Sequence, residues 1–138
     1  MEFNDFIKEK KVIKGAKDTQ KAKALVKMSH EALRAAAKLA ENNDSAPFVL
    51  STAYTALRQI LDAICLQQGY KIYSHEAYTY FLRMMNERIA AEKFDRYRRL
   101  RNGIEYYGKT VSIATSNEAL KDIKNLTAQL RKKHLKLL

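Results

Sequence analysis

The chain has 138 residues, 46% of them hydrophobic, which suits one domain over residues 1–138 and leaves no room for a second domain of ordinary size. One Pro and four Gly are too few for the many turns of an all-β fold, so the composition predicts an all-α fold. The formal net charge of +11, with a sequence pI of about 9.8, favours partners such as RNA, DNA or an acidic protein surface. A lysine-rich solvated surface would give the same charge.

The cysteine content and the hydropathy restrict where the chain works. Cys65 is the only cysteine, so no intramolecular disulfide and no cysteine-built zinc site can form, and a reducing cytoplasmic compartment is expected. Lysines rather than an apolar run follow the first residues. No segment approaches the roughly 18 apolar residues that span a bilayer. The sequence therefore predicts neither secretion nor a membrane-spanning segment.

The first half of the chain predicts two long helices. Residues 1–18 are an amino-terminal extension or a short helix, and residues 19–41 carry a stripe of small and apolar side chains at helical spacing. Residues 42–45 form a polar loop, after which Ser45 is the expected N-cap of a helix that ends near Gln68, before Gly69. The expected inner face of this helix consists of Leu50, Ala53, Leu57, Ile60, Leu61 and Ile64. Small side chains in the stripe predict close antiparallel packing of these two helices.

The second half predicts three more helices. One begins after an N-cap at Ser74, and another covers residues 90–107 and ends at Gly108. The expected apolar face of the latter consists of Phe94, Tyr97, Leu100, Ile104 and Tyr107. A capping box of Thr115 and Glu118 predicts the start of the last helix, which runs into a basic tail over residues 131–138 that is expected to be solvated. Together these segments predict an up-and-down antiparallel bundle of about five helices.

Charged and aromatic residues gather between Arg98 and Gly108. Arg98, Asn102 and Tyr106 follow one another at four-residue spacing along one strip of the predicted helix, and Arg101 lies on a neighbouring strip. A guanidinium, an amide and a phenol on one surface can hold a phosphate and stack a base or ribose. The segment is therefore the candidate nucleotide- or RNA-binding site. No motif for a metal ion or another cofactor accompanies it.

Several segments together resemble the HEPN superfamily of small helical-bundle proteins. They are two long antiparallel helices, the run of residues 53–63, the Gly69-Tyr70 break, residues 74–76 and the Arg101-Asn102 pair. The resemblance covers about residues 19–130 and implies a HEPN-like bundle and a homodimer. It also implies metal-independent RNA cleavage, often by a toxin paired with a small nucleotidyltransferase in a toxin-antitoxin system.

The HEPN resemblance leaves catalysis open. The family's motif is an Arg, a polar residue and then a His a few positions later, and Arg101 and Asn102 match its beginning while Tyr106 stands where the His belongs. A histidine can exchange a proton near neutral pH, whereas a tyrosine with its ordinary pKa of about 10 is a poor general base. We therefore expect nucleotide or RNA binding, or partnership with a nucleotidyltransferase, without catalysis. The alternative is a ribonuclease that uses Arg101 and Tyr106.

A purely structural role for the same residues is a third interpretation. In it, Arg101 forms an ion pair with Glu105, Tyr106 packs in a dimer interface, and Asn102 bonds to its copy in the partner subunit. The three histidines support no other site. His75, next to the predicted N-cap, is expected on the surface of a first helical turn, and His30 and His134 are expected to be solvated.

Overall fold

A computed structural model describes residues 1–136 and residue 138, and its fold is a mostly all-α helical bundle, as the composition predicted. The described helices and strands run in chain order from α1 to α6: α1 (Phe3–Lys8), β1 (Val12–Lys14), α2 (Thr19–Leu39), the short 3-10 helix η1 (Asn43–Ser45), α3 (Ala46–Gln67), β2 (Tyr70–Ile72), α4 (Glu76–Met84), α5 (Arg88–Tyr107) and α6 (Ile113–His134). None of the described helices is long and apolar enough to cross a membrane.

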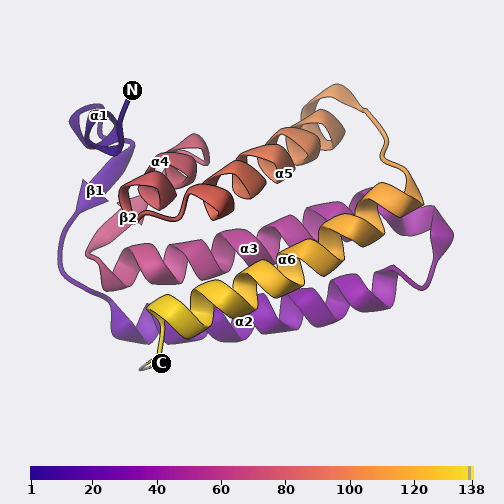
Figure 1. The fold of residues 1–138 in the computed structure, drawn as a ribbon, viewed down its shortest axis with the longest axis horizontal. Helices are drawn as coiled ribbons and strands as arrows, with labels where there is room; N and C mark the ends of the chain where they lie inside the picture. Colours follow the sequence, from indigo (N-terminus) through magenta and orange to yellow (C-terminus); the bar gives the residue numbers. More distant parts are fainter. Residues whose placement is uncertain (137) are drawn as a thin grey trace.

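The helices α2 and α3 form a long antiparallel hairpin (Figure 1). Small residues bring them close together, because Ala22 and Ala36 of α2 are fully buried and the Ser29 hydroxyl donates a hydrogen bond to the carbonyl oxygen of Ala56 at 2.7 Å. The predicted inner face of α3 is confirmed, since every one of its members is buried: Leu50, Ala53, Leu57, Ile60, Leu61 and Ile64. Cys65 is a buried free thiol on the same helix.

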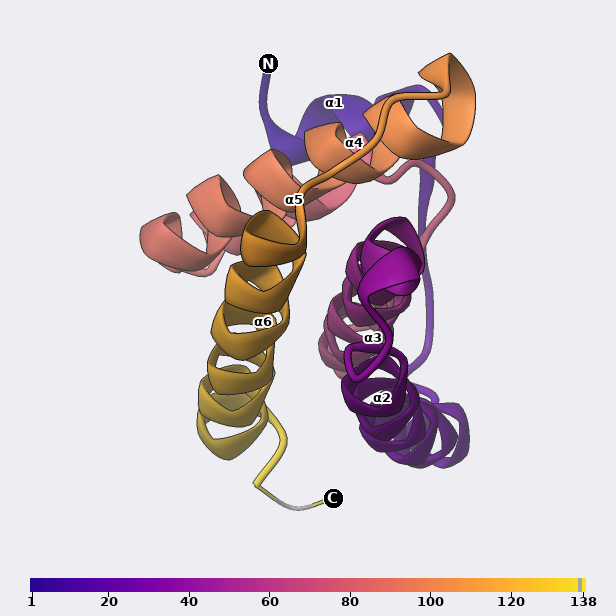
Figure 2. The same ribbon diagram turned by 90° about the vertical axis from the view of Figure 1, so that its right-hand side faces the viewer.

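The other helices complete the bundle around α3. The helix α6 runs beside α3 and buries Ile123, Leu126 and Leu130, while α4 and α5 cover the side of α3 that is turned away from α2 (Figure 2). Phe94 of α5 is fully buried in this core. The predicted face of α5 is wrong at its end, because Tyr107 lies in the last turn and is 76% exposed.

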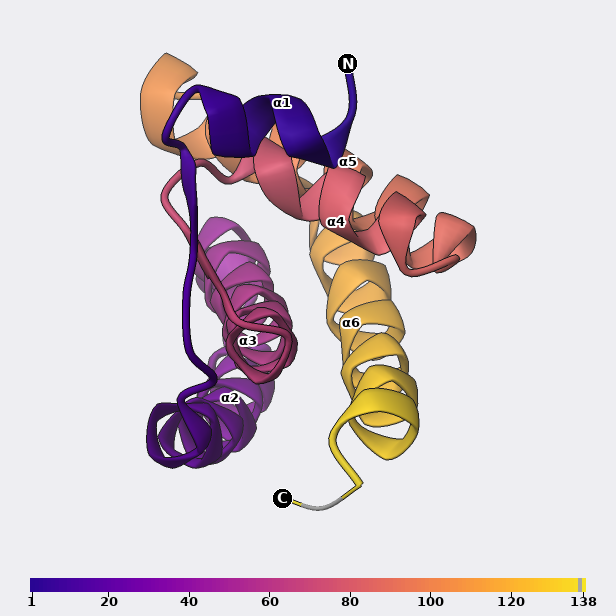
Figure 3. The same ribbon diagram turned by 90° about the vertical axis from the view of Figure 1, so that its left-hand side faces the viewer.

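The amino-terminal segment is ordered by contacts that sequence spacing did not predict. β1 pairs with β2 in a two-stranded antiparallel sheet in which Val12 faces Ile72. The helix α1 lies over α4 (Figure 3), where the ring centroid of Phe3 is 5.5 Å from that of Phe81. Residues 1–14 therefore belong to the folded body, in line with the predicted short helix.

Two predicted helix starts are wrong by a small shift. The N-cap of α4 is His75 rather than Ser74. The N-cap of α6 is Ser112, whose side chain accepts a hydrogen bond from the backbone amide of Thr115, so Thr115 lies inside the helix instead of capping it. The predicted stops are confirmed, because Gly69 and Gly108 follow α3 and α5 with positive φ angles of 84° and 62°.

The predicted basic tail is only partly solvated. The helix α6 continues to His134, and the Lys133 ammonium contacts a carboxylate oxygen of Glu87 at 2.6 Å. Leu135 is 3% exposed and packs against the core. Position 137 of the tail lies outside the described residues. The basic run that begins at Arg131 is therefore part of the fold as far as Leu135.

Candidate functional site

Three of the four predicted site residues gather in the last turns of α5. The guanidinium carbon of Arg101 lies 5.7 Å from the ring centroid of Tyr106 and 5.5 Å from that of Tyr54 on α3. The Arg101 Nη1 atom also donates to the side-chain oxygen of Asn102 at 3.4 Å. Two aromatic rings thus contact Arg101, one of them buried and the other, that of Tyr106, 69% exposed.

Arg98 does not share the exposed strip with Tyr106. Its Nη2 atom donates to Asp95 at 2.8 Å, and only 17% of its side chain is exposed. Its Nε atom is buried and has no hydrogen-bond partner in the described part of the chain. The prediction that Arg98 belongs to the exposed binding strip is therefore wrong in geometry. Its positive charge still acts on Tyr54 and His75, which lie near Arg101.

The ion pair between Arg101 and Glu105, one part of the structural interpretation, is not formed. Across residues 1–136 and 138, no carboxylate lies within 4 Å of the Arg101 guanidinium. Glu105 is exposed on the same helix. Arg101 is therefore a cation stacked near two tyrosines, with its charge available to an anion.

His75 is the residue that the sequence prediction missed. It lies at the start of α4, is partly buried, and its Nδ1 atom shares a 2.9 Å hydrogen bond with the hydroxyl of Tyr54. The same Tyr54 ring contacts Arg101, so His75 and Arg101 approach one another through a common neighbour. The expectation that His75 is a plain surface residue is wrong. No local pattern could have shown this contact, because Tyr54 and His75 come from different helices.

A network of aromatic and charged side chains fixes the position of Tyr54. Its ring stacks on Phe94 with centroids 5.5 Å apart, and the Tyr78 ring meets the edge of Phe94 at 5.4 Å. The Tyr78 hydroxyl donates to the Asp62 carboxylate, which also accepts a 2.9 Å hydrogen bond from Arg58. These contacts come from α3, α4 and α5 and hold the site in place.

The protonation states at this site follow from burial and from the nearby arginines. Burial, followed by the positive charges of Arg58, Arg101 and Arg98, lowers the pKa of His75 to about 4. Burial also raises the pKa of Tyr54 above its ordinary value, against the opposing charge of Arg101. At neutral pH the pair is therefore an uncharged imidazole bonded to an uncharged phenol. Its surroundings favour a bound anion, because the positive charges of Arg58, Arg98 and Arg101 act on it.

The other histidines lie away from this site. His30 is exposed on α2, as predicted. His134 is not solvated as predicted, because its side chain is 13% exposed and its Nε2 atom lies 3.7 Å from a carboxylate oxygen of Glu87. Within the described residues, no three His, Cys, Asp or Glu side chains are grouped so that they could hold a metal ion.

Comparison with known proteins adds no assignment. No protein-family model matches the chain, and a search of curated proteins finds no match. HEPN membership therefore stays a prediction from the sequence.

Proposed function

We propose that the chain binds RNA or a nucleotide at the Arg101 surface, which we define as Arg101, Asn102, Tyr106 and His75. One observation carries the proposal: the Arg101 guanidinium has no carboxylate partner in the described chain, and two tyrosine rings lie within 6 Å of it. A guanidinium without a counter-ion, oriented by aromatic neighbours, is suited to bind a phosphate by donating two parallel hydrogen bonds to its oxygens. The net charge of +11 would bring a polyanion to the surface.

The neighbours of Arg101 supply the rest of a nucleotide-binding surface. The exposed Tyr106 ring offers a face on which a base can stack, an interaction that every base can make. The Asn102 amide can bond to a base edge or a ribose hydroxyl. The uncharged His75 imidazole can give or take one hydrogen bond without adding charge. Such a surface binds single-stranded RNA through shape and phosphate rather than through a fixed base sequence.

We expect Arg101→Gln to weaken the binding of a short single-stranded RNA by about tenfold, because a charge-assisted phosphate contact is lost. The salt dependence of binding should also fall by about one released counter-ion. Fluorescence anisotropy at several salt concentrations measures both quantities. Arg99→Gln is the matched control, because Arg99 carries the same charge on α5 but is 74% exposed and paired with Asp95.

Two results would contradict this assignment. One is equal weakening by Arg101→Gln and Arg99→Gln, which would mean that only the net charge matters. The other is an unchanged affinity and salt slope in Arg101→Gln. Adding a mononucleotide as competitor separates the two ligand forms, since a nucleotide site is blocked by micromolar mononucleotide and a longer RNA site is not.

The resemblance to HEPN proteins supports two partners for the same surface. It implies a homodimer whose α5 ends meet, and a small nucleotidyltransferase as the companion in a toxin-antitoxin-like pair. The 69% exposure of Tyr106 leaves its ring free to pack against a second subunit. Sedimentation of Tyr106→Ala tests this arrangement, because a dimer that depends on the tyrosine should dissociate.

Ribonuclease activity is the second candidate, and the position of His75 favours it. Tyr106 has no hydrogen-bond partner among the described residues that could activate it, whereas His75 is already bonded to Tyr54 near Arg101. With a pKa near 4, His75 is unprotonated at neutral pH but accepts a proton weakly. A phosphate bound beside the arginines would raise that pKa and strengthen the base.

We expect RNA to stay intact after long incubation with the purified protein in the presence of a chelator. Gel analysis of labelled RNA measures this directly. Cleavage that His75→Gln abolishes and Tyr106→Phe leaves unchanged would replace the binding proposal by a ribonuclease with His75 as its base. Cleavage that only Tyr106→Phe abolishes would instead confirm the tyrosine alternative.

A further inference from the structure

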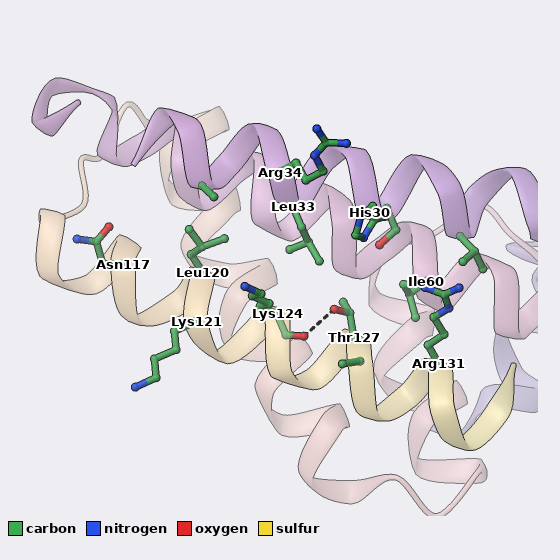
Figure 4. Close-up of a pocket in the computed structure, with 14 residues that line it drawn as sticks. His30, Leu33, Arg34, Ile60, Asn117, Leu120, Lys121, Lys124, Thr127 and Arg131 are labelled. Carbon is green, nitrogen blue, oxygen red and sulfur yellow. Dashed lines mark hydrogen bonds between the residues drawn. The ribbon is translucent and has the colours of Figure 1, made fainter. Parts of the chain in front are cut away.

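A groove of about 600 Å³ lies between α2 and α6, and it shares no residue with the Arg101 surface. Leu33 points from α2 toward α6, and Leu120 points back toward α2 (Figure 4). Ile60 of α3 forms part of the floor. Leu33 and Leu120 are only partly buried, so the groove exposes apolar surface along its length.

The polar groups of the floor are already satisfied within the chain. The Ser29 hydroxyl donates to the carbonyl oxygen of Ala56 at 2.7 Å, and the Thr127 hydroxyl donates to that of Lys124 at 3.0 Å (Figure 4). A ligand in the groove therefore gains mainly by burying apolar surface there. The groove differs in this respect from the Arg101 surface, where polar groups remain open.

The charge around the groove is of one sign. Its lining contains several basic side chains and no Asp or Glu; the basic residues are His30, Arg34, Lys121, Lys124 and Arg131. Those on α6 are distributed from Lys121 to Arg131, a span of ~15 Å at the rise of an α-helix. The groove thus combines an apolar floor with cations along its whole length.

We propose that this groove docks an acidic amphipathic helix of a partner protein. The groove lining on α6 begins at Asn117 and ends at Arg131, which is ~21 Å at the rise of an α-helix, so a partner helix of about four turns matches its length. Such a helix can place its apolar stripe on Leu33, Ile60 and Leu120. Carboxylates along the flanks of that helix would meet cations at several positions, as the spread from Lys121 to Arg131 requires. An anionic amphiphile with one head group would need cations at one end only. A second copy of this chain, with its net charge of +11, would not complement the cations that line this groove.

The experiment uses the full chain and a synthetic 16-residue peptide with Leu at positions i, i+3, i+4 and i+7, Glu along the flanks of this stripe, and Gln and Ala on the opposite face. We expect Lys124→Glu with Arg131→Glu to weaken binding of this peptide by about tenfold or more in fluorescence anisotropy. Both side chains are exposed, so the double variant should fold normally. The matched control is Lys132→Glu with Lys71→Glu, which changes the same charge outside the groove.

A scrambled peptide of the same composition distinguishes docking from simple attraction between opposite charges. We expect it to bind at least tenfold more weakly, because it cannot place an apolar stripe on the floor. The proposal is overturned if the scrambled peptide binds equally well, or if the two double variants weaken binding equally. Displacement of the peptide by micromolar dodecanoate would identify an amphiphile site instead. Self-association that Lys124→Glu with Arg131→Glu abolishes would identify a second copy as the occupant.

Discussion

Replacing Gly69 with Ala is expected to lower the free energy of unfolding by about 2–4 kcal/mol. Gly69 has a φ of +84°, where a residue with a Cβ atom is strained. A Cβ added there would lie 2.5 Å from the carbonyl oxygen of Gly15, which belongs to the backbone and cannot turn aside. The backbone would have to shift, and the 2.7 Å hydrogen bond from the Gly15 amide to the Gly69 carbonyl would weaken. Urea denaturation followed by circular dichroism measures the loss.

Gly108→Ala is the matched control for this prediction. Gly108 has a φ of +62°, but apart from its own atoms and its two chain neighbours, no atom of the described residues lies within 4 Å of the position that its Cβ would occupy. It therefore carries the conformational strain without the clash, and a loss of about 1 kcal/mol is expected. Equal losses in the two variants would show that the close approach of Gly15 has no energetic effect.

Replacing His75 with Gln is expected to remove part of the acid sensitivity of the fold. Burial, with the charges of Arg58, Arg101 and Arg98, lowers the pKa of His75 to about 4 in the folded chain, compared with 6.5 in the unfolded chain. As the pH falls from about 6.5 to about 4, the unfolded chain binds a proton that the folded chain does not. The parent protein therefore loses stability as the pH falls through this window, and His75 causes no such loss above pH 6.5.

The size of the effect is set by the partial exposure of the imidazole. Because solvent screens it, we expect on the order of 1–2 kcal/mol between pH 7 and pH 4.5. Urea denaturation at both pH values gives the loss for the parent, for His75→Gln and for His30→Gln. His30 is exposed, so the His30→Gln variant should follow the parent. Parallel losses in all three proteins would show that His75 titrates alike in the folded and unfolded chains.

The helices were predictable because their information is local. The stripe of Ala and Leu on residues 19–41 and the inner face of residues 50–64 repeat at the helical period, and the structure places helices over both. Gly69 and Gly108 were predictable as stops, since a left-handed residue favours Gly. The start of α6 was not, because Ser112 and Thr115 are both good capping residues and only the structure decides between them.

The strands and the histidine contact were unpredictable because they depend on distant parts of the chain. β1 has three residues, too few for a periodic signal, and it is stabilised by pairing with β2 beyond two long helices. His75 meets Tyr54 only because the fold brings the start of α4 against α3, where Tyr78 of α4 also bonds to Asp62. Arg98 and Arg101 show the same limit. Their neighbouring strips on the helix were predicted from spacing, but the pairing of Arg98 with Asp95 and the approach of Arg101 to the Tyr54 ring were not.

The pairing of β1 with β2 has a consequence for the order of folding. It closes a loop that contains the whole α2–α3 hairpin, and closing a long loop costs more entropy than forming a hairpin from neighbouring segments. Next to this ladder, the backbone amide of Tyr73, two residues before His75, donates a hydrogen bond to the carbonyl oxygen of Lys11. We therefore expect the hairpin to form early and the imidazole to reach Tyr54 late. In stopped-flow refolding, most of the circular dichroism signal of the helices should then appear before the contact between His75 and Tyr54 forms.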